Sequence, residues 1–197
     1  MSKSYEYRLV EAHRVVTALH MAGFAGAVVA GGYLRDSRLG LDPKDMDVFI
    51  PHCAQRDNDI LAFNLQAALG MEVNLQFNIS EYANLEVCRI FEATPEPHWT
   101  SHDAVPIQVI ELNRGLAPQG RELDFGLCQV WMGHDGAVHS TPAYEQDIRE
   151  KTFTLLKAET EDEHRRSLRR WERLKVKLEP LGFRFVDRSP FSDEVVL

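Results

Sequence analysis

The chain has 197 residues, enough for one domain with or without a small appendage, and its 44% hydrophobic and 26% charged residues exclude a disordered or collagen-like protein. Acidic residues outnumber basic residues by 30 to 22, so the net charge of −8 argues against a uniformly basic protein that coats nucleic acid. The cysteines are odd in number and far apart, which favours neither a disulfide framework nor a thiolate zinc site: Cys53, Cys88 and Cys128. Because no apolar run could span a membrane and the N-terminus does not read as a signal peptide, we expect a cytoplasmic protein with no membrane partner.

The N-terminal quarter of the chain predicts two rounds of helix followed by strand. Apolar residues recur at helical spacing over 7–21, and a short apolar run over 25–30 indicates a buried strand. Gly31 and Gly32 end that strand sharply. A short helix over 33–39 and a second apolar strand over 46–50 are expected to follow.

The middle of the chain predicts one helix and several strands. Helical spacing continues over 57–69, and alternating patterns predict strands at 71–79 and 85–91. A segment at 93–106, rich in proline, threonine and histidine, is expected to be a surface loop. Further strands are expected at 107–112, 124–132 and 137–140, and the Asp135-Gly136 pair predicts a hairpin turn between the last two.

Charge and helix-forming residues dominate the chain from about residue 141. Two helices are expected there, at 146–156 and 162–178. We therefore expect a head domain over 1–140 and a helical, neck-like segment over 141–197. The second helix carries the concentrated positive patch of an otherwise acidic chain, namely Arg165, Arg166, Arg169, Arg170, Arg173, Lys175 and Lys177.

Residues 31–50 combine features that suit a bound polyphosphate and a hard cation. A Gly31-Gly32 turn between strand and helix lets backbone N–H groups approach an anion, and Arg35 supplies a fork of donors one turn later. Asp45 and Asp47 are two residues apart on an expected strand, so both carboxylates project from one face. Such oxygen ligands suit Mg²⁺ or Mn²⁺. Each feature alone is common as a plain turn or a solvated surface, but their combination favours a site.

The segment Gly-Gly-Tyr-Leu-Arg-Asp followed by Lys-Asp-Met-Asp-Val resembles the head domain of polymerase-β-type nucleotidyltransferases, in particular bacterial CCA-adding enzymes and poly(A) polymerases. The resemblance implies an α+β fold, a mixed sheet flanked by helices with a small helical appendage. It also implies that Asp45 and Asp47 hold the catalytic metals, while Gly31, Gly32 and Arg35 serve the triphosphate.

Two later segments are similar to the same family, with departures. Residues 121–127 resemble its Arg-Arg-Asp-Phe strand, which makes Asp124 a candidate third acid, although Leu123 replaces the usual arginine; Glu111 is the alternative acid. Residues 162–169 and the closing Leu-Gly-Phe resemble the neck helix, whose acid and arginine read the incoming base, which points to Glu163 and Arg166. Glu172 stands where a further family arginine is expected, so base choice does not transfer.

The function implied is metal-dependent transfer of a nucleoside monophosphate from an NTP to an acceptor hydroxyl, with release of pyrophosphate. An RNA 3′ end is the favoured acceptor, and the resemblance suggests a minimal, stand-alone form without the domains that grip tRNA. Two alternatives stay open: a toxin-like transferase that modifies a protein or tRNA, and a nucleotide-binding module without turnover.

Other signals carry less weight. A phosphohydrolase metal site built from His98, His102 and Asp103 is disfavoured because these residues fall in the expected loop. His134 and His139 flank the hairpin turn and are expected to face solvent. The scattered tryptophans are expected to be core or interface packing, and of Trp99, Trp131 and Trp171 only Trp171, within the basic helix, could stack on a base.

Overall fold

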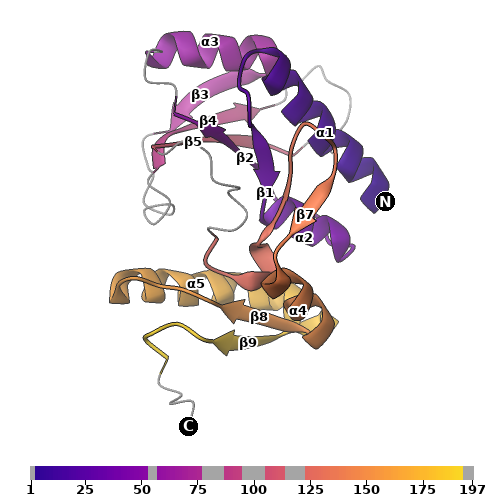
Figure 1. Ribbon diagram of the computed structural model, residues 1–197, viewed down its shortest axis with the longest axis vertical. Coiled ribbons are helices and arrows are strands. Elements are labelled where there is room, and N and C mark those ends of the chain that lie inside the picture. The colour runs from indigo at the N-terminus through magenta and orange to yellow at the C-terminus, as the bar shows by residue number, and fades with distance from the viewer. Residues whose placement is uncertain (1–2, 53–56, 77–86, 95–104, 114–122, 193–197) are drawn as a thin grey trace.

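The computed structural model describes residues 3–52, 57–76, 87–94, 105–113 and 123–192 (Figure 1). Within them, one seven-stranded sheet has the order β3-β4-β5-β2-β1-β6-β7, and β8 and β9 form a second, two-stranded sheet. The strands of the large sheet are β1 (Val28–Ala30), β2 (Met46–Pro51), β3 (Glu72–Gln76), β4 (Val87–Thr94), β5 (Ile107–Leu112), β6 (Val130–Met132) and β7 (Val138–Ser140). Its β2–β5 pair is parallel and its other pairs are antiparallel, so the sheet is mixed. The expected α+β class is confirmed.

Each of the four longer helices begins where the sequence offers a capping side chain. The helices are α1 (Tyr5–Met21), α3 (Asn58–Leu69), α4 (Pro142–Glu150) and α5 (Glu161–Leu178). In each case the side-chain oxygen of the N-cap residue accepts a hydrogen bond from the backbone N–H three residues further on; the caps are Ser4, Asp57, Thr141 and Thr160. None of the helices in the described ranges is long and apolar enough to cross a membrane.

One face of the large sheet is apolar and covered by helices. Val48 is paired across the sheet with Val109, and Val109 with Phe91, so these buried side chains form a row on one face. Helix α3 packs against β3 and against α1, and buries Leu61 and Leu65. The hydrophobic core therefore lies between this face and the two helices, which appear together beside the sheet in Figure 1.

The C-terminal part contains two strands that the sequence analysis did not predict. Helix α4 ends at Lys151 with a left-handed φ of 55°, and β8 (Thr152–Leu155) follows, so the helix expected over 146–156 is wrong beyond residue 150. The buried Asp147 carboxylate explains the reversal, because it accepts hydrogen bonds from the hydroxyls of Thr152 and Thr154. Burial raises the pKa of Asp147.

A short parallel pair and an aromatic stack complete this part. Strand β8 pairs with β9 (Arg184–Asp187), and the Trp171 ring of α5 stacks between Phe153 and Phe185, 5.5 Å from each centroid. At 8% exposure Trp171 is packing, as expected of most such tryptophans, and its ring is not available to stack on a base. The strand expected over 124–132 is also shorter than expected: a 3₁₀ turn, η3 (Gly126–Cys128), precedes β6. The boundary placed at residue 140 stays a prediction.

Candidate functional site

The glycine turn follows β1 and opens helix α2 (Gly32–Arg38). Gly31 has a φ of +77°, which an L side chain rarely adopts, and its N–H donates to the Val130 carbonyl at 2.9 Å. A Cβ at this position would lie 3.2 Å from Leu123 Cδ1, so the turn is also closely packed. Gly32, the next residue, is partly exposed, and it presents backbone at the end of β1.

The two aspartates lie at the start of β2, one just before the strand and one within it. Asp45 and Asp47 are partly exposed, whereas Met46 and Val48 between and after them are buried at 3% and 0% exposure. This alternation places both carboxylates on the face opposite the helices, with their Cα atoms about 6.6 Å apart at the usual rise of a strand. The Asp45 carboxylate forms an ion pair with the neighbouring Lys44, at 3.7 Å.

Strand pairing brings the aspartates and the glycine turn to one edge of the sheet. Because β1 runs antiparallel to β2, with Val29 opposite Val48, the end of β1 at Ala30 lies beside the start of β2. The chain then enters the Gly31 turn directly. Both features were expected to form one site. The sheet topology makes them neighbours, although Gly32 and Asp45 are 13 positions apart in the chain.

Two polar side chains that the sequence analysis did not single out share the face of Asp47. Gln108 of β5 is paired directly with Asp47, and Glu92 of β4 is paired with Gln108. The Glu92 carboxylate accepts a hydrogen bond of 2.9 Å from Gln76 of β3. A polar row thus crosses four strands. The signal in the sequence was weak, a single acid flanked by apolar residues in the middle of β4.

Glu111, the alternative third acid, lies on the opposite face. It is opposite Ile50 across the β2–β5 pair, so it shares the helix-covered face and not that of Asp47. Its side chain is fully buried and is bound by the Arg89 guanidinium, which also donates to Asn58, the first residue of α3. The structure therefore does not bring Glu111 to the aspartate pair.

Asp124, the favoured third acid, is bonded to the C-terminal helix. Its carboxylate accepts from the Ser167 hydroxyl at 2.8 Å and from Arg170 Nη1 at 3.1 Å, and the residue is 7% exposed. Leu123, one residue earlier, packs on the glycine turn. Asp124 thus joins the turn region to α5.

Arg35 is buried beneath the turn, at 2% exposure. Its guanidinium donates to the adjacent Asp36 at 2.6 Å and to Cys128 Sγ at 3.2 Å, and Asp36 also binds Lys177 of α5. Burial acts to lower the pKa of Arg35, but Cys128 and Asp36 outweigh it, so the pKa is raised and the group stays charged. This ionic cluster braces α2 and α5, and the guanidinium does not reach the solvent-facing side of the turn.

Glu163 and Arg166 lie together on the first turns of α5, and their expected role in reading the incoming base stays a prediction. Their side chains form an ion pair at 3.9 Å with exposures of 16% and 30%. Glu163 also accepts from the backbone N–H of Glu159, so it helps to start the helix. Neighbouring cations remain at the surface: Arg165, Arg169 and Arg173. His134 and His139 are exposed, as expected. His98, His102 and Asp103 lie outside the described residues.

Solved structures with a similar fold include CCA-adding enzymes. The chain superposes on the Thermotoga maritima CCA-adding enzyme complexed with tRNA with a TM-score of 0.59 and 14% identity, covering 93% of this chain and 42% of that one. For a CCA-adding enzyme with CTP, the TM-score is 0.57 at 13% identity, and the match covers 93% of this chain and 43% of that one. For the Bacillus stearothermophilus CCA-adding enzyme in complex with CTP, the TM-score is 0.55 at 18% identity, and the match covers 91% of this chain and 41% of that one. This chain therefore has their fold and spans about two fifths of their length. No family model matches its sequence, and neither does any curated protein.

Proposed function

We propose that the chain transfers a nucleoside monophosphate from an NTP to an acceptor hydroxyl and releases pyrophosphate. The observation that carries the proposal is the pair Asp45 and Asp47, both partly exposed on one face of the sheet and beside the Gly31 turn. The fold shared with CCA-adding enzymes supports it, because those enzymes are described with CTP and with tRNA.

The donor atoms on this face fit a hard divalent cation. Asp45 and Asp47 offer carboxylate oxygens and Gln108 offers an amide oxygen, the donors that Mg²⁺ prefers. We infer that the two aspartates hold Mg²⁺, with Mn²⁺ as a substitute. Such an ion, when bound, neutralises the triphosphate and lowers the pKa of an acceptor hydroxyl.

Other residues of the chain have separate roles in the reaction. Gly32, partly exposed at the turn, lets the triphosphate approach the backbone, and Gly31 adopts the positive φ that forms the turn. In the transfer step the acceptor oxygen bonds the α-phosphorus, the bond to the bridging oxygen breaks, pyrophosphate leaves and the hydroxyl proton passes to water. Arg35 acts as a positioning residue: its buried guanidinium holds α2, the helix that the Gly31 turn opens, through Asp36 and Cys128.

For the third acid, Glu92 is a better candidate than the residues that sequence patterns suggested. It shares the face of Asp47, whereas Asp124 is held by Ser167 and Arg170. That engagement of Asp124 also favours the second candidate function, a nucleotide-binding module without turnover. The acceptor we favour is an RNA 3′ end, for which the exposed arginines of α5 supply cations; a protein acceptor is the alternative.

The test is incubation of the full chain with each α-labelled NTP, Mg²⁺ and either total RNA or total protein, followed by gel analysis. We expect Asp47→Asn to lower incorporation by about 100-fold or more, because even an outer-shell change at a metal site costs ~10–100-fold. Asp59→Asn is the matched control: it removes an exposed aspartate of α3, on the helix side of the sheet, and should label normally.

Three outcomes distinguish the candidate functions. Label in RNA that depends on Asp47 supports the proposal, and label in protein changes the acceptor but keeps the chemistry. Binding of NTP without release of pyrophosphate supports the non-catalytic module. Incorporation by Asp47→Asn at the wild-type rate would contradict the assignment of the metal ligands.

A further inference from the structure

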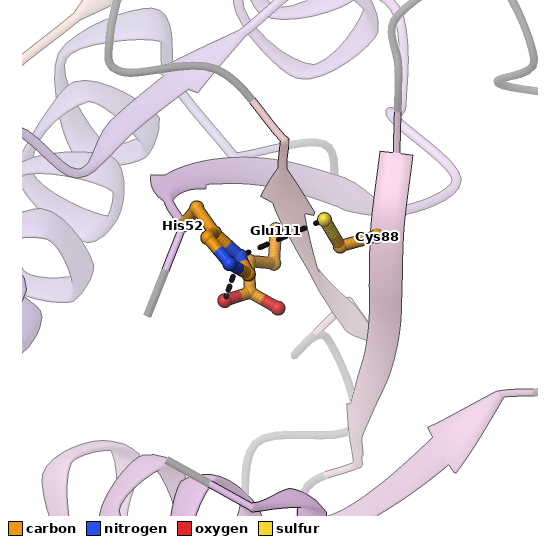
Figure 2. Close-up of side chains that lie close together, drawn as sticks. All are labelled: His52, Cys88 and Glu111. Atoms are coloured by element: carbon orange, nitrogen blue, oxygen red, sulfur yellow. Dashed lines mark hydrogen bonds and ion pairs between the residues drawn. The ribbon is translucent and has the colours of Figure 1, made fainter. Parts of the chain in front are cut away.

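Three side chains with different donor atoms converge at the far end of the same sheet (Figure 2). His52 directly follows β2, Cys88 is the second residue of β4, and Glu111 lies on β5 between those two strands. Their ligand atoms all lie within 4.8 Å of one another. His52 is exposed, Cys88 is partly buried and Glu111 is buried, so the group is open on one side.

A local irregularity of β4 turns the thiol toward the other two groups. Val87 is opposite Leu112 and Arg89 is opposite Glu111, so β4 has one more residue than β5 between these pairs, and that residue is Cys88. In a regular strand, Cys88 and Arg89 would point to opposite faces. A β-bulge changes the direction in which a side chain points. Here Arg89 donates to Glu111, and the Cys88 thiol contacts His52, the neighbour of Glu111.

The spacing of the donor atoms matches a tetrahedral zinc ion. Zinc–nitrogen, zinc–oxygen and zinc–sulfur bonds of ~2.0–2.3 Å at tetrahedral angles place a nitrogen about 3.4 Å from an oxygen and about 3.6 Å from a sulfur. In the structure, His52 Nδ1 lies 3.3 Å from Glu111 Oε1 and 3.6 Å from Cys88 Sγ. One nitrogen, one sulfur and one oxygen are donors that zinc accepts and that Mg²⁺, with its preference for oxygen, does not.

The geometry does not suit a nucleophilic triad. A histidine that relays a proton uses one ring nitrogen toward the nucleophile and the other toward the carboxylate. Here the same atom, Nδ1 of His52, faces both the Cys88 thiol and the Glu111 carboxylate. Convergence on one point is the arrangement that a single bound ion requires.

The supporting contacts also resemble those of a metal site. Arg89 donates to both oxygens of Glu111 and in turn donates to Asn58 at 3.0 Å, which fixes the orientation of the carboxylate. A carboxylate has lone pairs for an arginine fork and for a metal at the same time.

We propose that His52, Cys88 and Glu111 bind one Zn²⁺ ion, with a fourth position left for water or another donor. The site is separate from the aspartate pair, because it lies on the helix-covered face and, counting along β2 from Asp47 to His52, about 16 Å away. Bound zinc would tie the ends of β2, β4 and β5 to one another. Zinc binding at these three residues does not depend on whether the chain transfers nucleotides.

The test is cobalt and zinc binding to the purified full chain. After removal of metals, Co²⁺ should produce the near-ultraviolet charge-transfer band of a cobalt–thiolate bond, Zn²⁺ should abolish it at one equivalent, and a large excess of Mg²⁺ should not. Cys88→Ser should eliminate the band and lower zinc affinity by about 100-fold or more. Cys128→Ser, which removes a thiol buried near Arg35, is the matched control and should keep both.

Further variants keep the outcomes distinct. His52→Gln changes an exposed side chain, so it should fold, as circular dichroism would verify, and should also lose zinc. Asp47→Asn should keep the cobalt band even if it abolishes nucleotide transfer. Absence of a band in the wild type, a band that persists in Cys88→Ser, or zinc lost in Asp47→Asn but not in His52→Gln would each overturn the proposal.

Discussion

Gly31 is the residue whose backbone the candidate site depends on most directly. It combines a positive φ with a neighbour, Leu123 Cδ1, at 3.2 Å from where a Cβ would stand. Gly40, at the end of the α2 region, has a similar φ of +71° but nothing within 4 Å. Both glycines therefore have a strained φ, but Gly31 adds a ψ of −125°, outside the left-handed helical region, and a close steric contact.

Replacing each glycine by alanine separates these costs. Gly40→Ala should lower the free energy of unfolding by ~1–2 kcal/mol, the usual penalty of a left-handed conformation for an L residue. Gly31→Ala should lower it by more, because Leu123 must also shift inside a packed region. Urea unfolding of both variants measures the difference, and equal losses would show that Leu123 moves aside freely.

Helix α5 is one of the elements that attach the C-terminal part to residues earlier in the chain. Ser167 and Arg170 bind Asp124, and about two turns beyond Arg170 Lys177 binds Asp36, which is 2% exposed. The basic patch that the sequence shows on this helix is thus divided. Some of its cations hold carboxylates of the head, and others face solvent.

Removing the Lys177 contact tests this attachment. Lys177→Met keeps the apolar stem but removes the charge, and we expect a loss of about 1 kcal/mol in the free energy of unfolding, since Asp36 retains Arg35 as a partner. Lys175→Met is the control, because Lys175 pairs with Glu172 on the same helix at the surface. It should leave the urea midpoint unchanged; a shift as large as that of Lys177→Met would count against the attachment.

Elements with a local cause could be predicted from the sequence, and those with a remote cause could not. The helices follow from periodicity and from caps such as Thr160, which lie within a few residues of the turns that they stabilise. Strand β8 contains residues that favour strands, such as Thr152 and Phe153, but it is short, it follows a helix directly, and its partner β9 lies about 30 residues later. The hydrogen bonds of its threonines to the buried Asp147 also depend on packing, which no short pattern in the sequence records.

At the scale of the whole molecule, some features of the candidate site could be predicted from local patterns in the sequence, and others could not. Asp45 and Asp47 share a face because of strand alternation, which is local. Glu92 joins them only through the order of β4, β5 and β2 in the sheet, which no short pattern records. Arg35 was assigned to the triphosphate by its position in a motif, but its burial with Asp36 depends on packing against residues 90 positions and more away.

The stability of the whole chain should carry an acid-sensitive contribution from Asp187. Burial acts to raise the pKa of this carboxyl, but hydrogen bonds from His164, at 2.6 Å, and from Ser189 outweigh it, so the pKa is lowered. The folded state therefore favours the ionised form, and the contribution is complete above the unfolded pKa of ~3.9 and is lost as the pH falls through the lower folded value. Because a chain of this size usually unfolds cooperatively, global unfolding reports this local contribution.

Asp187→Asn should thus be less stable than the wild type by about 1 kcal/mol near neutral pH, and the difference should shrink as the pH falls below about 4. Asp135→Asn is the matched control, since Asp135 also bonds a histidine, His139, but at 52% side-chain exposure is screened by water. Chemical unfolding of the three proteins across this pH range gives the result, and a difference for Asp187→Asn that did not vary with pH would contradict the role of its charge.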